Sequence, residues 1–167
     1  MSISAILGRS DSDSASLQGY RIEKVLSQSG RGSVCRASTP TQEGTVIVKM
    51  LTDESPTPQA LSRFYLEVEY TRRVPAGGQP RVLRVGILDG APCMVLRDLG
   101  QTTLAQQLQT RRLRLEEALT IAVRLTRALA EIHQLGIIHK DINPDNIVLS
   151  ADGAEPAIID FGIATEL

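Results

Sequence analysis

Hydrophobic and polar residues alternate along the first part of the chain, which is the pattern of strands that bury one face. The alternation predicts one strand at YRIEKVL (20–26) and a second at SVCRAS (33–38). The segment GTVIVKML (44–51) predicts a third strand, because its β-branched residues favour extended backbone. The STPTQEG segment, which separates the last two, has the composition of a hairpin turn.

The pattern then changes to the spacing of a helix and afterwards returns to strands. The segment ALSRFYLEVEYTRRV (60–74) places four apolar residues on one helical face, Leu61, Phe64, Tyr65 and Val68. The preceding DESPTPQ (53–59) resembles a helix start, and PAGGQP (75–80) breaks the helix. The segment RVLRVGILDGAPCMVLRD (81–98) predicts two strands joined by a tight Asp-Gly turn.

Helical spacing dominates the rest of the chain. TTLAQQLQTRR (102–112) suits a short helix, and LEEALTIAVRLTRALAEIHQLG (115–136) predicts a long amphipathic helix that Gly136 ends. NIVLS and PAIID then predict a small hairpin around ADGAE. A strand-rich first half and a helical second half predict two lobes, with a boundary near residues 99–101.

Composition and charge narrow the classes of function. Hydrophobic residues make up 42% of the 167 residues, as in an ordinary globular domain, and the absence of Trp predicts an aliphatic core. The net charge of −1 gives no electrostatic case for a nucleic-acid or membrane partner. Cys35 and Cys93 are too widely spaced for a metal motif and are expected to be buried free thiols.

The N-terminal residues 1–17 are rich in Ser and Asp and are predicted to be a disordered tail. They have neither the basic nor the apolar region of a signal peptide. No apolar run in the sequence approaches the length of a membrane span. These patterns predict a cytoplasmic location without a membrane span.

The loop after the long predicted helix carries the chemistry. GIIHKDINPDNIVL places carboxylates and carboxamides between two apolar runs, and rigid flanks around clustered polar groups favour a site. His139, Asp141, Pro144 and Asn146 form the pattern H-x-D-x-x-P-x-N, and Asp-Phe-Gly begins fourteen residues after Asn146, at position 160. These segments resemble the catalytic loop and the DFG segment of eukaryotic-type protein kinases.

The resemblance covers residues 20–167 and implies an α+β fold with two lobes. The N-lobe, about 18–98, would hold a five-stranded antiparallel sheet and one helix, and 101–167 would form a partial helical C-lobe. The segments VIVK, HKDINPDN and IIDFGIA are most similar to kinase domains of large bacterial multi-sensor signalling proteins. Further signalling domains of a longer parent protein are therefore expected partners, and the protein substrate stays open.

The resemblance also implies ATP and Mg²⁺ as cofactors and assigns roles to individual residues. Asn146 and Asp160 would hold the metal, which prefers hard oxygen ligands. Asp141 would orient the attacking hydroxyl or accept its proton. Lys49 in VIVK would contact the α- and β-phosphates and pair with Glu67 on the following helix. His139 and Phe161 would be structural supports.

The segment that would cover the phosphates departs from the family's glycine-rich pattern. In SQSGRGSV, Ser27 and Ser29 replace two glycines, whereas Gly32 and Val34 fit. Serine can still offer backbone N–H groups to a phosphate. The resemblance implies a nucleotide site lined by these residues together with Leu26, Lys49, Glu67 and the backbone of Arg97 and Leu99 in the LRDLG hinge. Leu96 would stand at the gatekeeper place.

Two substitutions in the loop and the short C-terminal match leave the activity open. Lys140 replaces the usual arginine, and Asn143 replaces a lysine common in Ser/Thr kinases. The match stops five residues after DFG, before the segment that docks a peptide substrate. The leading hypothesis is a Ser/Thr protein kinase domain. The alternatives are a non-catalytic nucleotide-binding or interaction module, and a small-molecule phosphotransferase, which the IIDFGIA continuation disfavours.

Overall fold

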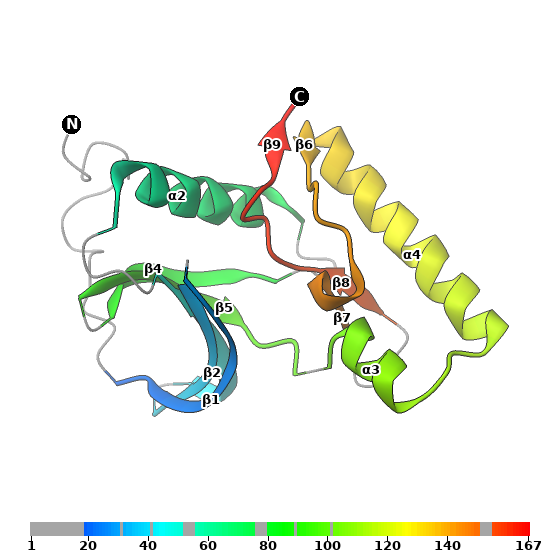
Figure 1. Cartoon of the computed structure of the whole chain (residues 1–167), viewed down its shortest axis with the longest axis horizontal. Helices are drawn as coiled ribbons and strands as arrows, with labels where there is room; N and C mark the ends of the chain where they lie inside the picture. The colour runs from blue at the N-terminus through cyan, green and yellow to red at the C-terminus, as the bar shows by residue number, and fades with distance from the viewer. Residues whose placement is uncertain are drawn as a thin grey trace. The chain divides into compact units, whose positions relative to one another are not determined.

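The computed structural model describes residues 19–30, 32–40, 42–51, 56–75, 80–88, 90–100, 102–150 and 155–167 (Figure 1). The predicted tail 1–17 lies outside this part of the chain. The chain divides into two compact units, each described here by itself. One unit comprises residues 1–56 and 83–96, and the other comprises 57–82 and 97–167.

The first unit is built on a five-stranded sheet with the strand order β1-β2-β3-β5-β4. The strands are β1 (Arg21–Ser29), β2 (Gly32–Thr39), β3 (Gln42–Met50), β4 (Val82–Leu88) and β5 (Ala91–Arg97). All five were predicted, and β1 is longer at its C-terminal end than the alternation indicated. Gly90, in the turn between β4 and β5, has a φ of +85°, which explains the glycine of the Asp-Gly pair. The expected α+β class is therefore confirmed.

Alternating side chains of β2 and β3 supply the core of this sheet. Cys35 is opposite Val48 and Ala37 is opposite Val46 in the antiparallel register, and all four are buried. Ala37, Val46 and Val48 form one buried cluster with residues of β4 and β5, namely Leu88, Cys93 and Val95. Strand β1 is exposed along its whole length, as expected of an edge strand. Both cysteines are buried free thiols, as predicted.

The second unit begins with helix α2 (Pro58–Arg73). The Thr57 hydroxyl accepts a hydrogen bond from the Ala60 N–H (3.2 Å), and Pro58 occupies the first turn, where its missing N–H costs nothing. The helix therefore starts two residues before the predicted position. Its buried side chains include Phe64, Val68 and Glu67, a carboxylate that needs a polar environment.

Helices α3 (Leu104–Thr110) and α4 (Leu115–Gln134) follow. Thr103 and Gln106 form a reciprocal capping box at the start of α3. Gly136, with a φ of +73°, ends the long helix as predicted. The apolar face of α4 contributes Ile132 to a core with Tyr70, Val74, Ile137, Ile158 and Phe161, and Ile121 to a second core with Leu104, Ile147 and Leu149.

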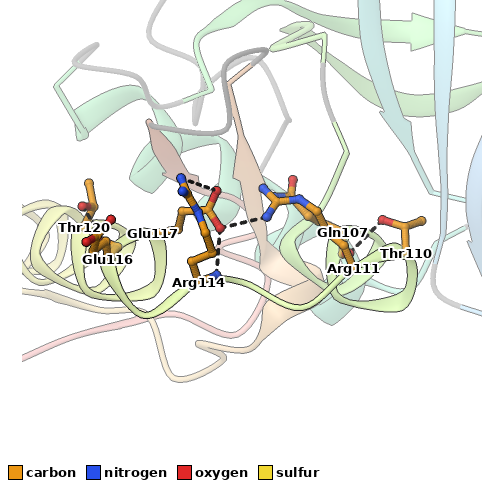
Figure 2. Close-up of polar contacts among 7 residues, drawn as sticks. All are labelled: Gln107, Thr110, Arg111, Arg114, Glu116, Glu117 and Thr120. Carbon is orange, nitrogen blue, oxygen red and sulfur yellow. Dashed lines mark hydrogen bonds and ion pairs between the residues drawn. The ribbon is translucent and has the colours of Figure 1, made fainter.

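Polar contacts fix the short connection between α3 and α4 (Figure 2). One carboxylate oxygen of Glu117 accepts hydrogen bonds from the Arg111 guanidinium (2.8 Å) and from the Arg114 backbone N–H (2.8 Å). The pKa of Glu117 lies below its usual value. The largest cause is the bond from Arg111, and the bond from the Arg114 N–H is the next. The Glu117 carboxylate thus caps the first turn of α4 and attaches it to the end of α3.

Short elements after α4 carry the predicted loop. They are β6 (Ile137–Ile138), the 3₁₀ turn η1 (Pro144–Asn146), β7 (Ile147–Leu149), β8 (Pro156–Ile158) and β9 (Thr165–Glu166). The predicted hairpin is β7–β8. The antiparallel pairing of β6 with β9, visible beside the C-terminal end of α4 in Figure 1, was not predicted.

The two units do not coincide in every respect with the predicted lobes. Residues 57–82, which include α2, group with the helical part of the chain. The predicted domain boundaries themselves stay a prediction. In the described part of the chain, no helix is both long enough and apolar enough to cross a membrane.

Candidate active site

The β7–β8 hairpin brings the two predicted metal ligands to the same place. Ile147 is opposite Ile158, so Asn146 and Ile159 lie at the end of the hairpin. The Ile159 N–H donates to the Asn146 carbonyl (3.0 Å) and extends the pairing by one bond. Asp160 follows immediately. Two residues that are fourteen positions apart in the sequence are thereby held at one end of a small, hydrogen-bonded element.

His139 connects the two halves of the loop. It is 1% exposed, and its Nε2 lies 3.0 Å from the Ile159 carbonyl, while its Nδ1 accepts the Asp141 N–H (3.2 Å). Nε2 therefore carries the proton. Burial is the largest cause of the lowered pKa of His139, outweighing the Ile159 bond and the nearby carboxylates of Asp160 and Asp141. The neutral ring also packs edge-to-face against Phe161, with ring centroids 4.8 Å apart.

Asp141 is held by two carboxamides, one for each carboxylate oxygen. Asn143 Nδ2 donates to Oδ1 (2.8 Å), and Asn146 Nδ2 donates to Oδ2 (2.8 Å). Asn146 Nδ2 also lies 3.0 Å from the Asp141 backbone carbonyl. These contacts fix the orientation of a carboxylate on a loop, which a base or an orienting group requires.

The sequence did not predict the role of Asn143. It indicated only that an asparagine stands where a lysine is common in Ser/Thr kinases. Asn143 Oδ1 accepts the N–H groups of Asp145 (2.9 Å) and Asn146 (3.2 Å), so Asn143 caps η1 while its amide group holds Asp141. The signal was present, because Asn followed by Pro is the typical start of a helical turn. Asp145, the middle residue of η1, is exposed.

Asp160 lies close to Glu67 of helix α2. The Gly162 N–H donates to Asp160 Oδ1 (3.1 Å). A Cβ at Gly162 would lie 3.0 Å from Asp160 Oδ1, which is a tight contact, and 3.5 Å from Glu67 Oε2, which is an ordinary one. Glu67 is 6% exposed. The second unit thus packs the buried acid of α2 against the Asp-Phe-Gly segment.

Two residues of the site have a backbone conformation that L-residues rarely adopt. Among the described non-glycine residues, Lys140 (φ +65°) and Asp160 (φ +66°) alone have positive φ. Such a conformation costs about 1–3 kcal/mol and persists only where surrounding contacts enforce it. Here each strained residue adjoins an anchored one, since His139 precedes Lys140 and Ile159 precedes Asp160.

The donor set fits a magnesium ion that shares its ligands with phosphates. The Asn146 Nδ2 group donates to two oxygens of Asp141, so the Oδ1 atom of Asn146 is the one that could be a metal ligand. Asp160 supplies a carboxylate. The described residues contain no cluster of three or more His, Cys, Asp or Glu side chains suited to a metal. One carboxylate and one amide oxygen suit Mg²⁺, which keeps its remaining positions for water and phosphate.

The first unit holds the residues predicted to cover the phosphates. Leu26, Ser27 and Ser29 lie on β1, where Ser27 is opposite Val34 and Ser29 is opposite Gly32. The Ser29 hydroxyl donates to the Gly32 carbonyl (3.3 Å). Because a Cβ at Gly32 would lie 2.6 Å from the Met50 carbonyl oxygen, only glycine fits there. Gly32 therefore satisfies a packing need whether or not a phosphate binds.

Lys49 lies on β3, opposite Val34 of β2. Arg97 and Leu99 follow in the predicted hinge, where the Arg97 N–H donates to the Arg81 carbonyl (2.9 Å). Lys49 belongs to the first unit, whereas Glu67, Asp141 and Asp160 belong to the second. Hydrogen bonds join the side chains of Asp141, Asn143 and Asn146, and Asp160 lies near Glu67. The pairing of Lys49 with Glu67 stays a prediction.

The sequence is also similar to those of known proteins. The sequence matches the protein kinase domain family over residues 20–167. It is 33% identical over 149 residues to the probable serine/threonine-protein kinase PkwA of Thermomonospora curvata, with 89% of this chain and 20% of PkwA covered. It is 32% identical over 151 residues to serine/threonine-protein kinase PknK of Mycobacterium tuberculosis, covering 87% of this chain and 13% of PknK. PknA of the same species is 30% identical over 152 residues, covering 35% of PknA.

Proposed function

Because the chain belongs to the protein kinase family, we propose that it binds ATP with Mg²⁺ and transfers the γ-phosphoryl group to serine or threonine hydroxyls. The observation that carries the proposal is the fixed Asp141 carboxylate, with one amide donor on each oxygen. Phosphoryl transfer depends on positioning and charge stabilisation more than on covalent chemistry by the protein. A loop that orients one carboxylate beside a set of metal-type oxygens meets that need.

The residues of the second unit would act on the two ends of the transfer. Asp141 would orient the attacking hydroxyl and accept its proton. The Asn146 amide oxygen and the Asp160 carboxylate would hold Mg²⁺, which when bound neutralises charge on the phosphate oxygens. Neutral His139 would keep the loop and the Asp-Phe-Gly segment in register through its bond to Ile159. Each role uses an atom that the hydrogen-bond network leaves in a defined position.

The remaining predicted residues would bind the nucleotide. Lys49, paired with Glu67, would contact the α- and β-phosphates, and the β1–β2 hairpin would cover them with the backbone of Ser27, Ser29 and Gly32. The Arg97 N–H is engaged by Arg81, so Arg97 would meet the adenine through its carbonyl oxygen.

Equilibrium binding of ATP, with and without Mg²⁺, tests the proposal. Lys49→Met and Asp160→Asn should each weaken Mg²⁺-dependent binding by about ten- to a hundredfold, since a hydrogen bond to a charged group contributes roughly 1.5–3 kcal/mol. Lys24→Met, on the exposed strand β1, is the matched control and should bind as the unchanged chain does. Equal affinity of the unchanged chain and the first two variants would contradict the proposal.

A non-catalytic nucleotide-binding module is the second candidate. Two observations favour it, the serines at positions 27 and 29 and the absence of a lysine at position 143. Release of phosphate from ATP separates the two functions. The kinase proposal expects slow release that Asp141→Ala abolishes while ATP binding is retained. A chain that binds ATP and releases no phosphate above the level of Asp141→Ala would support the non-catalytic module.

The curated relatives are much longer than the matched segment, which spans 35% or less of PkwA, PknK and PknA. We propose that the kinase function is exercised in the cytoplasm, within a longer signalling protein whose substrate is another protein. Cell fractionation with an antibody against this chain tests the location and the size of the protein that carries it.

A further inference from the structure

Arg73, in the last turn of α2, contacts two other elements of the second unit. Its Nη1 pairs with the Glu166 carboxylate on β9, and its Nη2 donates to the Leu135 carbonyl (2.7 Å), at the C-terminal end of α4. Glu69, one turn earlier on α2, lies 4.0 Å away and adds a second negative charge. Arg73, Glu166 and the Leu135 carbonyl are here called the Arg73 junction.

Helix α2 shares a hydrophobic core with Phe161 and also meets the segment that follows Asp160 at two charged residues, Glu67 and Arg73. At the first place, Glu67 lies beside Gly162. At the second, Arg73 meets Glu166, six residues further along the helix and four residues further along the segment. A rigid helix that contacts a segment near the segment's start and near its end restricts how that segment can move.

Backbone hydrogen bonds hold the same end of the segment to the end of α4. Ile137 and Ile138 of β6 pair with Glu166 and Thr165 of β9, and the Leu167 N–H donates to the Gly136 carbonyl (2.9 Å). A two-residue ladder is too short to be stable alone. The side chain of Arg73 adds charge-assisted bonds at this corner, one to Glu166 on β9 and one to the Leu135 carbonyl at the end of α4.

We propose that Arg73 is a positioning residue, which fixes β9 to α2 and α4 and thereby holds Asp160 in its metal-binding conformation. The inference rests on the proposed function of Asp160. The left-handed backbone of Asp160 must be enforced by its surroundings. The Ile159–Asn146 bond precedes it, and the buried Phe161 and then β9 follow it, so fixing β9 adds to its support. The role is specific to this chain's Arg and Glu rather than to the loop motifs.

How much the Arg73 junction contributes to ATP binding depends on how exposed its charged side chains are. The side chains of Arg73 and Glu166 are 35% and 56% exposed, and exposed ion pairs contribute little by themselves. The Arg73 guanidinium, however, also bonds to the Leu135 carbonyl, so two interactions offset the entropy cost of ordering one side chain. We therefore expect Arg73→Ala to raise the Mg²⁺ concentration needed for ATP binding by roughly three- to tenfold.

Two measurements on the full chain test the junction. Amide hydrogen exchange should be about three- to tenfold faster in residues 160–167 of Arg73→Ala than in the unchanged chain, since local opening there becomes easier. In the same variant, ATP binding at low Mg²⁺ should weaken while binding in EDTA stays unchanged. Glu166→Gln should show a smaller effect, and adding it to Arg73→Ala should change nothing further. Arg72→Ala, on the adjacent exposed residue, is the matched control.

Three results would overturn the inference. They are unchanged exchange in Arg73→Ala, an equal change in Arg72→Ala, and a change of binding that is the same with and without Mg²⁺, which would indicate a general loss of structure. If the unchanged chain binds no ATP, the proposed function fails. Exchange in residues 160–167 and its double-mutant comparison then still decide whether the junction exists.

Discussion

At the scale of single residues, the site depends on Asn143 as much as on the acid it holds. The side chain of Asn143 caps η1 through Oδ1 and fixes Asp141 through Nδ2. These two tasks can be separated, because serine also caps a helical turn but has no amide group to reach Asp141.

Asn143→Ser should keep the stability of the chain and lower phosphate release from ATP about tenfold or more, since a lost hydrogen bond to a charged group corresponds to roughly 1.5–3 kcal/mol. Asn143→Ala should lose the cap as well, at a cost of about 1 kcal/mol in the free energy of unfolding. Denaturant titration and phosphate release measured on both variants check the separation. Equal release by Asn143→Ser and the unchanged chain would show that Asn146 alone orients Asp141.

His139 should make the folding stability sensitive to pH. Its pKa is lowered in the folded chain, so the unfolded chain binds the proton more tightly. The stability it contributes is complete above the unfolded value near 6.5 and is lost as the pH falls below it, toward the lowered folded value. Free energies of unfolding measured from pH 8 to pH 5 should therefore fall, and less steeply in His139→Gln. A slope in His139→Gln as steep as that of the unchanged chain would assign the pH dependence to other groups.

At the scale of elements, the sequence predicted the long, periodic segments and the β7–β8 hairpin, but not the two-residue pairing of β6 with β9. The five strands of the sheet and helices α2, α3 and α4 follow from alternation, helical spacing and capping residues, because each contains enough positions to show its period. Strands β6 and β9 contain two residues each, which is too few to show alternation, and their two pairs join residues 27 and 29 positions apart.

The candidate site was predicted from the spacing of particular residues and not from hydrophobic periodicity. Asp141, Asn146 and Asp160 were recognised from their spacing, and the structure brings them together through the β7–β8 hairpin. Asn143 and Arg73 were not assigned a role, because their partners come from local turn geometry and from separate elements. A side chain whose partners lie on three elements leaves no periodic signal in the sequence.

The connection between α3 and α4 carries a prediction of its own (Figure 2). Glu117→Gln should lower the thermal midpoint, because the Arg111 ion pair is lost and the capping bond from the Arg114 N–H weakens. The lowered pKa of Glu117 means that its contribution is present above pH 4.5 and is lost as the pH falls through the folded value. Glu116→Gln, also in the first turn of α4, is the control, and an equal loss of midpoint there would assign the effect to the helix dipole alone.

At the scale of the whole molecule, the predicted nucleotide ligands are divided between the two units. Lys49 and the residues of the β1–β2 hairpin belong to the first, and Asn146, Asp160 and Glu67 belong to the second. A ligand that binds only when both units are folded stabilises both, by about 2.7 kcal/mol at a concentration a hundred times its dissociation constant. Binding of Mg²⁺ and ATP should therefore couple the unfolding of the two units.

Calorimetry tests this coupling directly. Each unit has a hydrophobic core of its own, so each can contribute its own transition when no nucleotide is bound. With Mg²⁺ and ATP, both transitions should move upward and merge. Lys49→Met, a substitution in the first unit, should abolish the shift of the second unit as well, whereas Lys24→Met should not. A shift confined to one unit would mean that the nucleotide is bound by that unit alone, and the residues assigned to the other would then need a different function.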